Sequence, residues 1–556
     1  MFARIARGIR STLAAGEPER PTVVERAVVP DASAHPSPSA EELISEGLRQ
    51  RRQFGPAAAI PWFERAAQLD PNSHMPLLML GNAASEASDL DRAVGYYQAA
   101  RDLKPKDYLV RYNLGLNQLW RGYVHEAIEE LAGASYLNPS YLAAHSSLIF
   151  ALHNSDRTSP EEIVAVIREW AANFSAQHPA TAIAAADTAV DRKLRVGFIS
   201  GDFRTHSVAQ FFEPIASARN RDSFEYIFYS NGSQRDAVTE RLRECADVWH
   251  DVGQLTDNAL IELIRADRVD ILADLSGHTE FNRLAVFAQR AAPVQVTYLG
   301  FPNSTGLPTM DFRITDALTD PHPVADTWHT ERLLRLPDSQ WCFRPFGAPP
   351  LPGSLPARAA GYVTFGSFNN MMKVSDAILR CWAEILVKLP KSRLFLTRVR
   401  SRERAAEIVA TMERSGIAAD RIEWSPYRSE VPYGLQFAGI DIMLDTYPYN
   451  GVTTTCESLY VGVPVISLHG RHCVSRSGLS ILTTLGLGEL VAATPEQYVE
   501  IAVALASDVA RLEQLRRELR DRFERSPLRD ERTFAKNFED LLQTAWRRHH
   551  ASRPSE

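Results

Sequence analysis

The chain of 556 residues is too long for one hydrophobic core, so we expect two or three domains. Apolar residues make up 45% and charged residues 23% of the sequence, which is ordinary for a soluble globular protein. The net charge of −7 argues against a nucleic-acid-binding protein, and no apolar run is long enough for a transmembrane helix. The five cysteines show neither CxxC pairing nor metal-ligand spacing. We therefore expect a cytoplasmic protein without stable membrane insertion.

Residues 1–40 are predicted to form a disordered tail. The part from Gly16 onward is rich in Pro, Glu, Ala and Ser, and such a composition buries too little apolar surface to fold. The first ten residues carry three arginines but lack the apolar core of a signal peptide.

Residues 41–190 contain a repeat with a period of 34 residues. Pro71, Pro105 and Pro139 are 34 residues apart, and several Ala and Leu-Gly positions recur at the same interval. A closing Pro ends the second helix of each unit, and small Ala residues let paired helices approach closely. This period and pattern predict tetratricopeptide (TPR) repeats followed by connecting helices.

From about residue 191 to residue 345, strand-length apolar runs alternate with helix-like segments. The runs cover residues 194–200, 270–276 and 294–300, and helix-like patterns lie between them. This alternation predicts a Rossmann-like domain with a mostly parallel sheet. In such a domain, ligands bind at the carboxyl ends of the strands.

Three polar loops follow these predicted strands. One loop places His206 after the first strand, and another places His278 at the equivalent point of the next. A lone loop histidine is usually a surface residue, but two at equivalent positions favour a function, with His278 as a candidate substrate contact. The third loop, 300–306, contains Pro302 and is a weaker indication, because such turns are common.

The alternation resumes over residues 358–548, which we predict to form a second Rossmann-like domain. Strand-length runs cover residues 362–368, 392–397, 440–444 and 463–468. Two tandem domains of this kind predict a cleft between them, the common plan of nucleotide-sugar transferases.

The most informative segment follows the run at 440–444. A turn rich in Pro, Asn and Gly leads to Thr453, Thr454 and Thr455, which open a helix-like pattern. Thr is a good N-cap, and a helix begins with unpaired N–H groups and a positive dipole end. This arrangement predicts a phosphate site, with Glu457 about one turn further along and within reach of an attached sugar.

A second charged group is predicted to face this phosphate site. Asn369, Asn370 and Lys373 follow the run at 362–368, and Lys373 would neutralise charge on a diphosphate leaving group. The alternative is a solvated lysine. The only Asp-x-Asp, Asp89 to Asp91, lies in a repeat turn, where we interpret it as helix capping. We therefore expect no metal and no other cofactor.

Together these motifs resemble those of the O-linked N-acetylglucosamine transferase and SPINDLY family of protein glycosyltransferases. The resemblance extends from about residue 45 onward. It rests on four stretches of this sequence: Arg195 to Ser207, Ala292 to Thr309, Phe365 to Asn370 with Lys373, and Thr453 to Leu459. It implies a GT-B arrangement, a nucleotide-sugar donor, and inverting, metal-independent transfer to Ser or Thr hydroxyls of proteins.

The resemblance also implies roles for individual residues. Lys373 matches the lysine that contacts the donor diphosphate, and His206 matches a histidine once favoured as the general base, a role that is disputed. The remaining matches are to donor-binding positions: Asn370 near the phosphates, Thr453 and Thr454 on phosphate, Glu457 on the ribose, and Pro302 in the loop beside donor and acceptor.

The sequence departs from the O-GlcNAc transferases at the nucleotide site. Val452 stands where they carry a histidine, and Glu430 and Tyr433 stand where they carry a Lys and a His near the base. Tyr433 can still stack on a base, whereas Glu430 reverses the charge. Other stretches are closer to the SPINDLY branch, whose plant members use GDP-fucose. We favour UDP-N-acetylglucosamine as the donor, with GDP-fucose as the alternative.

The acceptors that we expect are proteins or peptides held in the groove of the repeats, since concave arrays of this kind hold extended peptides. A competing hypothesis is a peptide-binding scaffold whose transferase half has lost its donor. The altered residues Val452, Glu430 and Tyr433 support it, and the intact Lys373 and threonines oppose it. Transfer to a non-protein acceptor or to Asn is a third option.

Overall fold

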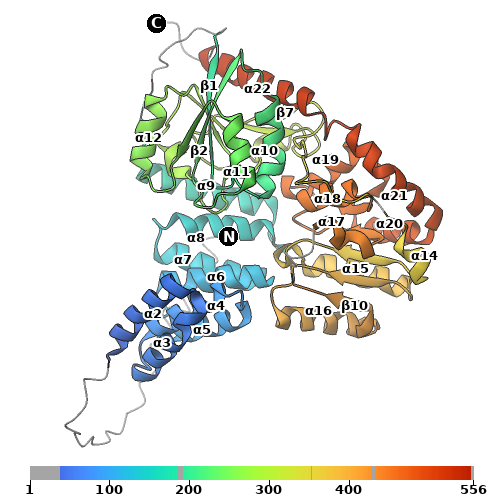
Figure 1. Ribbon diagram of the computed structural model, residues 1–556, viewed down its shortest axis with the longest axis horizontal. Helices are drawn as coiled ribbons and strands as arrows, with labels where there is room; N and C mark the ends of the chain where they lie inside the picture. Colours follow the sequence, from blue (N-terminus) through green and yellow to red (C-terminus); the bar gives the residue numbers. More distant parts are fainter. Residues whose placement is uncertain (1–37, 182, 184–191, 352, 427–432, 552–556) are drawn as a thin grey trace, which may run out of the picture. The chain divides into compact units, whose positions relative to one another are not determined.

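The computed structural model describes residues 38–181, 183, 192–351, 353–426 and 433–551 (Figure 1). The chain divides into two compact units. One comprises the residues up to Ala151 together with Val399–Ala406, and the other comprises Leu152–Arg398 and Glu407–Glu556. Among the described residues, no helix combines the length and apolar character needed to cross a bilayer.

The first unit is a stack of helix pairs that confirms the predicted repeat. Helices α2, α4, α6 and α8 begin 34 residues apart, and each of the first three packs on the helix that follows it. The bounds are α2 (Ala40–Phe54), α3 (Pro56–Leu69), α4 (His74–Glu86), α5 (Leu90–Leu103), α6 (Tyr108–Arg121), α7 (Val124–Leu137) and α8 (Leu142–His153).

The repeat has a local steric cause. In the second repeat, Gly81 of α4 packs against the ring of Tyr97 of α5, and a Cβ at position 81 would lie only 2.4 Å from a ring carbon. Gly47 meets Phe63 in the same way in the first repeat. Only glycine lets the two helices of a pair come this close, which explains its recurrence at this interval.

The two aspartates of the Asp-x-Asp in the repeat turn have different roles. Asp89 caps α5 by accepting from the Arg92 N–H at 3.3 Å, as predicted. Asp91 instead accepts from the Ser401 hydroxyl at 2.5 Å and from the Arg121 Nε at 2.7 Å. This contact anchors the segment Val399–Ala406 to the helices of the first unit. Asp91 and Ser401 are 310 positions apart in the sequence, so no local pattern predicts the contact.

The second unit contains two parallel sheets, and this confirms the predicted pair of Rossmann-like domains. In the first sheet the strand order is β3-β2-β1-β4-β5-β6-β7. Because β1 lies between β2 and β4, the loops that follow β1 and β4 meet at the point where the strand order reverses, which is where such sheets bind ligands.

The bounds of the first sheet and its helices are α9 (Pro160–Gln177), β1 (Leu194–Ser200), α10 (Ser207–Ala218), β2 (Phe224–Ser230), α11 (Ala237–Cys245), β3 (Val248–Asp251), α12 (Asp257–Ala266), β4 (Ile271–Asp274), α13 (Leu284–Ala288), β5 (Val294–Thr297), β6 (Phe312–Asp316), η1 (Ala325–Thr327) and β7 (Arg332–Leu336).

The second sheet has the order β10-β9-β8-β11-β12-β13, with its own reversal between β8 and β11. Its elements are α14 (Pro356–Ala360), β8 (Thr364–Ser367), η2 (Met371–Lys373), α15 (Asp376–Lys388), β9 (Arg393–Leu396), α16 (Arg402–Arg414), η3 (Ala419–Arg421), β10 (Ile422–Trp424), α17 (Tyr433–Gln436), η4 (Phe437–Gly439), β11 (Ile442–Leu444), α18 (Thr453–Tyr460), β12 (Val465–Leu468), η5 (Cys473–Ser475), α19 (Ser477–Thr484), η6 (Gly488–Leu490), β13 (Val491–Ala492), α20 (Pro495–Ser507) and α21 (Val509–Glu524).

The last helix, α22 (Glu531–Ala551), returns to the first sheet. It packs against α10, β5 and β7, and its Glu539 accepts from the Asn220 N–H at 2.9 Å (Figure 1). The segment that sequence reasoning assigned to the second α/β domain therefore contributes this helix to the first. A buried apolar face on α22, with Phe538 and Trp546 at its centre, accounts for the packing.

Candidate active site

A cavity of the second unit lies at the carboxyl ends of both sheets. Its volume is about 670 Å³. It is lined by loops after β1, β5, β8 and β9 and by the start of α18. Seven of the candidate catalytic and donor-binding residues line it: His206, Pro302, Asn370, Lys373, Thr453, Thr454 and Glu457.

Helix α18 directs its first turn at this cavity. Val452 is the N-cap, so Thr453 and Thr454 occupy the first helical positions rather than the capping position itself. The Thr454 hydroxyl donates to the Asn369 side-chain oxygen at 3.0 Å. Gly451, just before the helix, lies close to Thr454: a Cβ at position 451 would be only 2.2 Å from the Thr454 hydroxyl oxygen. The first N–H groups of a helix lack partners within it, so this turn presents donors and a positive dipole end to an anion.

Lys373 reaches the same cavity from the second sheet. Its Nζ donates to the Asn450 carbonyl oxygen at 2.9 Å and lies 4.1 Å from the centre of the Tyr449 ring. Burial lowers the pKa of the lysine to about 8, opposed by the charge of Asp445 and reinforced by that of Arg398. The ammonium therefore predominates at neutral pH and is available to a diphosphate.

Asp445, to which sequence reasoning gave no role, organises this region. The carboxylate follows β11, is 2% exposed, and accepts from the Gly451 N–H at 2.7 Å and the Ser467 hydroxyl at 2.7 Å. Burial raises its pKa to about 6, against the pull of these hydrogen bonds and of Lys373. The carboxylate thus holds the turn before α18 and offsets the lysine charge. In the sequence, the position of Asp445 directly after a strand and before a Gly-containing turn is the signal that could have identified it.

His206 is the N-cap of α10. Its Nδ1 accepts from the Val208 N–H at 3.3 Å, and an Asp202 carboxylate oxygen lies 3.4 Å from the same nitrogen. Only the Val208 contact has hydrogen-bond geometry, and it places the proton of the neutral ring on Nε2. Burial lowers the pKa of His206, an effect opposed by Asp202 and reinforced by Arg204. In this tautomer Nε2 carries the proton, so it can donate a hydrogen bond but cannot act as a base.

Glu457 lies on α18 and contacts the first sheet's helix α10. The Gln210 amide donates to a Glu457 carboxylate oxygen at 3.3 Å. Gln210 was not singled out from the sequence, because the two residues are 247 positions apart. This contact joins the helices that follow the first strand of one sheet and the fourth of the other.

The structure places His278 away from the cavity and corrects its prediction as a substrate contact. The side chain is 1% exposed and its Nε2 lies 3.0 Å from the Thr305 carbonyl oxygen. Its ring packs against Trp170 of α9 and against Phe301. The loop after β4 is covered by α9, and the histidine is therefore a core residue.

Two predictions near the nucleotide base fall at or beyond the edge of the described residues. Glu430 lies outside them. Tyr433 begins α17, and its side chain is not described. Its neighbours Gly434 and Phe437 line the cavity.

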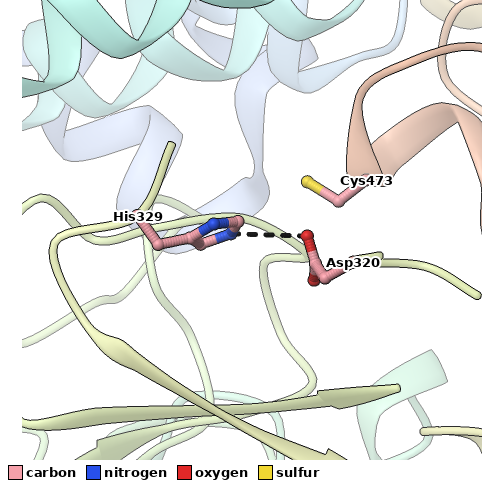
Figure 2. A group of neighbouring side chains, drawn as sticks. All are labelled: Asp320, His329 and Cys473. Carbon is pink, nitrogen blue, oxygen red and sulfur yellow. Dashed lines mark ion pairs between the residues drawn. The ribbon is translucent and has the colours of Figure 1, made fainter. Parts of the chain in front are cut away.

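A separate group of metal-binding side-chain types lies outside the cavity. Asp320, His329 and Cys473 are buried, and their ligand atoms lie within 4.8 Å of one another (Figure 2). The Arg313 guanidinium already pairs with the Asp320 carboxylate at 2.5 Å, and the Thr315 hydroxyl donates to the same oxygen at 2.6 Å. Because Arg313 neutralises Asp320, this carboxylate has little charge left to attract a cation.

Comparisons with known proteins agree with this architecture. The model of glycosyl transferase family 41 matches residues 139–342 and 354–538. The probable UDP-N-acetylglucosamine–peptide N-acetylglucosaminyltransferase SPINDLY of Solanum lycopersicum is 37% identical over 427 residues, covering 74% of this chain and 45% of that protein. The SPINDLY protein of Petunia hybrida, with the same full name, is 37% identical over 425 residues with the same coverage.

A solved structure gives the same result over a greater length. The O-GlcNAc transferase of Thermobaculum terrenum, solved as a mutant, is 35% identical to this chain with a TM-score of 0.84. The match covers 92% of this chain and 98% of that one. By contrast, the chain spans slightly under half the length of the SPINDLY relatives.

Proposed function

Since the chain belongs to glycosyl transferase family 41, we propose that it transfers a sugar from a nucleotide-sugar donor to Ser or Thr hydroxyls of proteins, with inversion and without a metal. One observation carries this proposal: a single cavity joins Lys373 to the open first turn of α18. A cation opposite a helix N-terminus suits a diphosphate, which is the leaving group of such a donor.

Seven of the lining residues have a role in this proposal. The N–H groups of Thr453 and Thr454 and the Thr453 hydroxyl bind the phosphates, and the Lys373 ammonium pairs with their charge. Glu457 accepts from the ribose hydroxyls, and Asn370 donates to a phosphate oxygen. Pro302 and His206 line the side of the cavity that belongs to the first sheet, where the acceptor would enter.

The reaction that we propose is a direct displacement. The acceptor hydroxyl oxygen forms a bond to the anomeric carbon, and the bond from that carbon to the diphosphate oxygen breaks. The diphosphate leaves with the electron pair, the proton of the acceptor hydroxyl passes to an oxygen of the departing diphosphate directly or through water, and Lys373 and the α18 dipole stabilise the remaining charge. His206 contributes a hydrogen bond from Nε2, since its Nδ1 is engaged with the Val208 N–H.

For the donor we favour UDP-N-acetylglucosamine, with GDP-fucose as the second candidate. The names of both SPINDLY relatives and of the Thermobaculum terrenum enzyme refer to N-acetylglucosamine transfer. Val452 at the N-cap of α18, in place of the histidine of the O-GlcNAc transferases, keeps GDP-fucose open. The acceptor that we propose is an extended polypeptide held by the helix pairs of the first unit.

The test is to incubate the full chain separately with each donor and follow nucleotide release and intact mass. A gain of one N-acetylhexosamine supports the favoured donor, and a gain of one deoxyhexose supports the alternative. The Lys373→Met variant is the matched control and should gain neither. A wild-type chain that releases no nucleotide and binds neither UDP nor GDP would contradict the proposal and favour the inactive scaffold.

A further inference from the structure

Arg398 is a cation of the cavity that the sequence reasoning did not single out. It follows β9 by two residues, at the carboxyl edge of the second sheet. Its side chain is half-buried and lines the cavity together with Lys373, Thr453 and Thr454. Lys373 lies in the segment after β8, and Arg398 lies in the loop after β9, the strand that pairs with β8.

The backbone of Arg398 is strained. Its φ is +63°, in the left-handed region that favours glycine. A non-glycine residue there costs about 1 kcal/mol or more, and such strain persists mainly where a side chain is needed. Leu299, with a φ of +77°, is another strained residue that lines the same cavity. Of the six non-glycine residues with a left-handed backbone in the described part of the chain, Leu299 and Arg398 are the two that line this cavity.

The charges that line the cavity are unbalanced towards the positive. Besides His206, the lining residues that carry a charge near neutral pH are Lys373, Arg398 and Glu457, and the buried Asp445 outside the lining offsets part of the Lys373 charge. The two cations are close enough that the Arg398 charge lowers the pKa of Lys373. A ligand of charge near −2 in this cavity would offset the repulsion between the two cations, because both would be attracted to it.

We propose that Arg398 is a second cationic residue of the donor site and binds the diphosphate together with Lys373. This inference rests on the proposed function. A guanidinium carries its donors in a planar fork that matches two oxygens of a phosphate, and it stays charged at every pH at which the protein is folded. Arg398 therefore contributes to donor affinity, and Lys373, whose ammonium is compact, contributes both to affinity and to neutralising the departing charge.

The left-handed backbone of Arg398 allows an effect on nucleotide binding to be distinguished from an effect on folding. Arg398→Gly removes the guanidinium and relieves the backbone, so the melting temperature should stay the same or rise. Affinity for UDP and GDP, measured by calorimetry on the full chain, should fall about tenfold to a hundredfold. Affinity for uridine or guanosine, which lack the diphosphate, should not change. Arg398→Lys should retain more nucleotide affinity than Arg398→Gln.

Arg268→Gly is the matched control. Arg268 also has a left-handed backbone, with a φ of +52°, but it is exposed and is not among the residues that line the cavity. Its substitution should change UDP affinity by less than twofold. If wild type binds UDP or GDP and Arg398→Gly binds it equally well, the role of Arg398 is wrong while the proposed function stands. If wild type binds neither nucleotide, both are wrong.

Discussion

The polar loops at the carboxyl edges of the two sheets have different roles. At the edge of the first sheet, His206 caps α10 and His278 is buried under α9. At the edge of the second sheet, Lys373, Arg398 and the first turn of α18 all line the cavity. Both edges follow the rule that ligands meet the carboxyl ends of parallel strands, yet among the residues that line the cavity only those of the second edge include lysine and arginine. The rule thus locates a site without saying which loop residues face it.

The largest expected effect comes from removing the lysine of the second edge. Lys373→Met keeps a side chain of similar length but removes the charge that stabilises the leaving diphosphate. We expect kcat with either donor to fall about a hundredfold to a thousandfold. Steady-state kinetics and single-turnover measurements would show this. A fall in kcat of less than threefold at unchanged melting temperature would mean that α18 alone stabilises the charge of the leaving diphosphate. The contrast between the two edges would then not hold.

The second edge should also show a pH dependence. Lys373 binds the diphosphate only as the ammonium, and its pKa in the free protein is lowered to about 8, first by burial and then by Arg398, with Asp445 opposing. UDP affinity should therefore be full below pH 8 and fall by up to about tenfold per pH unit above it. Calorimetry in buffers of different ionisation enthalpy should detect proton uptake near pH 8.5.

Asp445→Asn provides the control for this pH dependence. Without the carboxylate the pKa of Lys373 should drop further, and the fall in UDP affinity should begin at a lower pH. The Asn keeps a side-chain oxygen for the Gly451 N–H, so the turn before α18 should remain. Identical profiles in wild type and Asp445→Asn would show that Lys373 does not set the pH dependence.

A smaller effect is expected at the first edge, from His206→Asn. Asn caps helices well, so the hydrogen bond from the Val208 N–H and the stability of α10 should be retained. Since Nε2 of His206 donates rather than accepts, kcat should fall less than tenfold. A general base would instead cost about a hundredfold to ten thousandfold. A loss of that larger size, with an unchanged melting temperature, would mean that Nδ1 carries the proton and Nε2 is the base.

The smallest effect on activity is expected from His278→Phe. The ring can still pack on Trp170 and Phe301, but the Thr305 carbonyl oxygen loses its partner in a buried place. We expect a stability loss of about 1–3 kcal/mol by denaturant unfolding and no change in the UDP dissociation constant. A weakened dissociation constant at unchanged stability would restore His278 as a site residue.

Sequence reasoning recovered most of the second edge because its signals are local. Lys373 follows a strand, and three threonines follow a Gly-containing turn, so the chemistry can be recognised within a few residues. The same reasoning applied to the strand at 392–397 would have found Arg398. It failed at His278, because burial of that loop depends on α9, more than a hundred residues earlier in the chain.

The sequence by itself determined the helix pairs with their 34-residue period, the alternation of strands and helices, and the threonine-rich start of α18 after a Gly-containing turn. These features depend on glycine, proline, capping residues and hydrophobic spacing, which act over a few residues. Only the tertiary structure decided the return of α22 to the first sheet, the contact of Gln210 with Glu457 and the pairing of Lys373 with the Asn450 carbonyl. Burial, charge proximity and tautomer arise from groups that are distant in the chain, so no local pattern contains them.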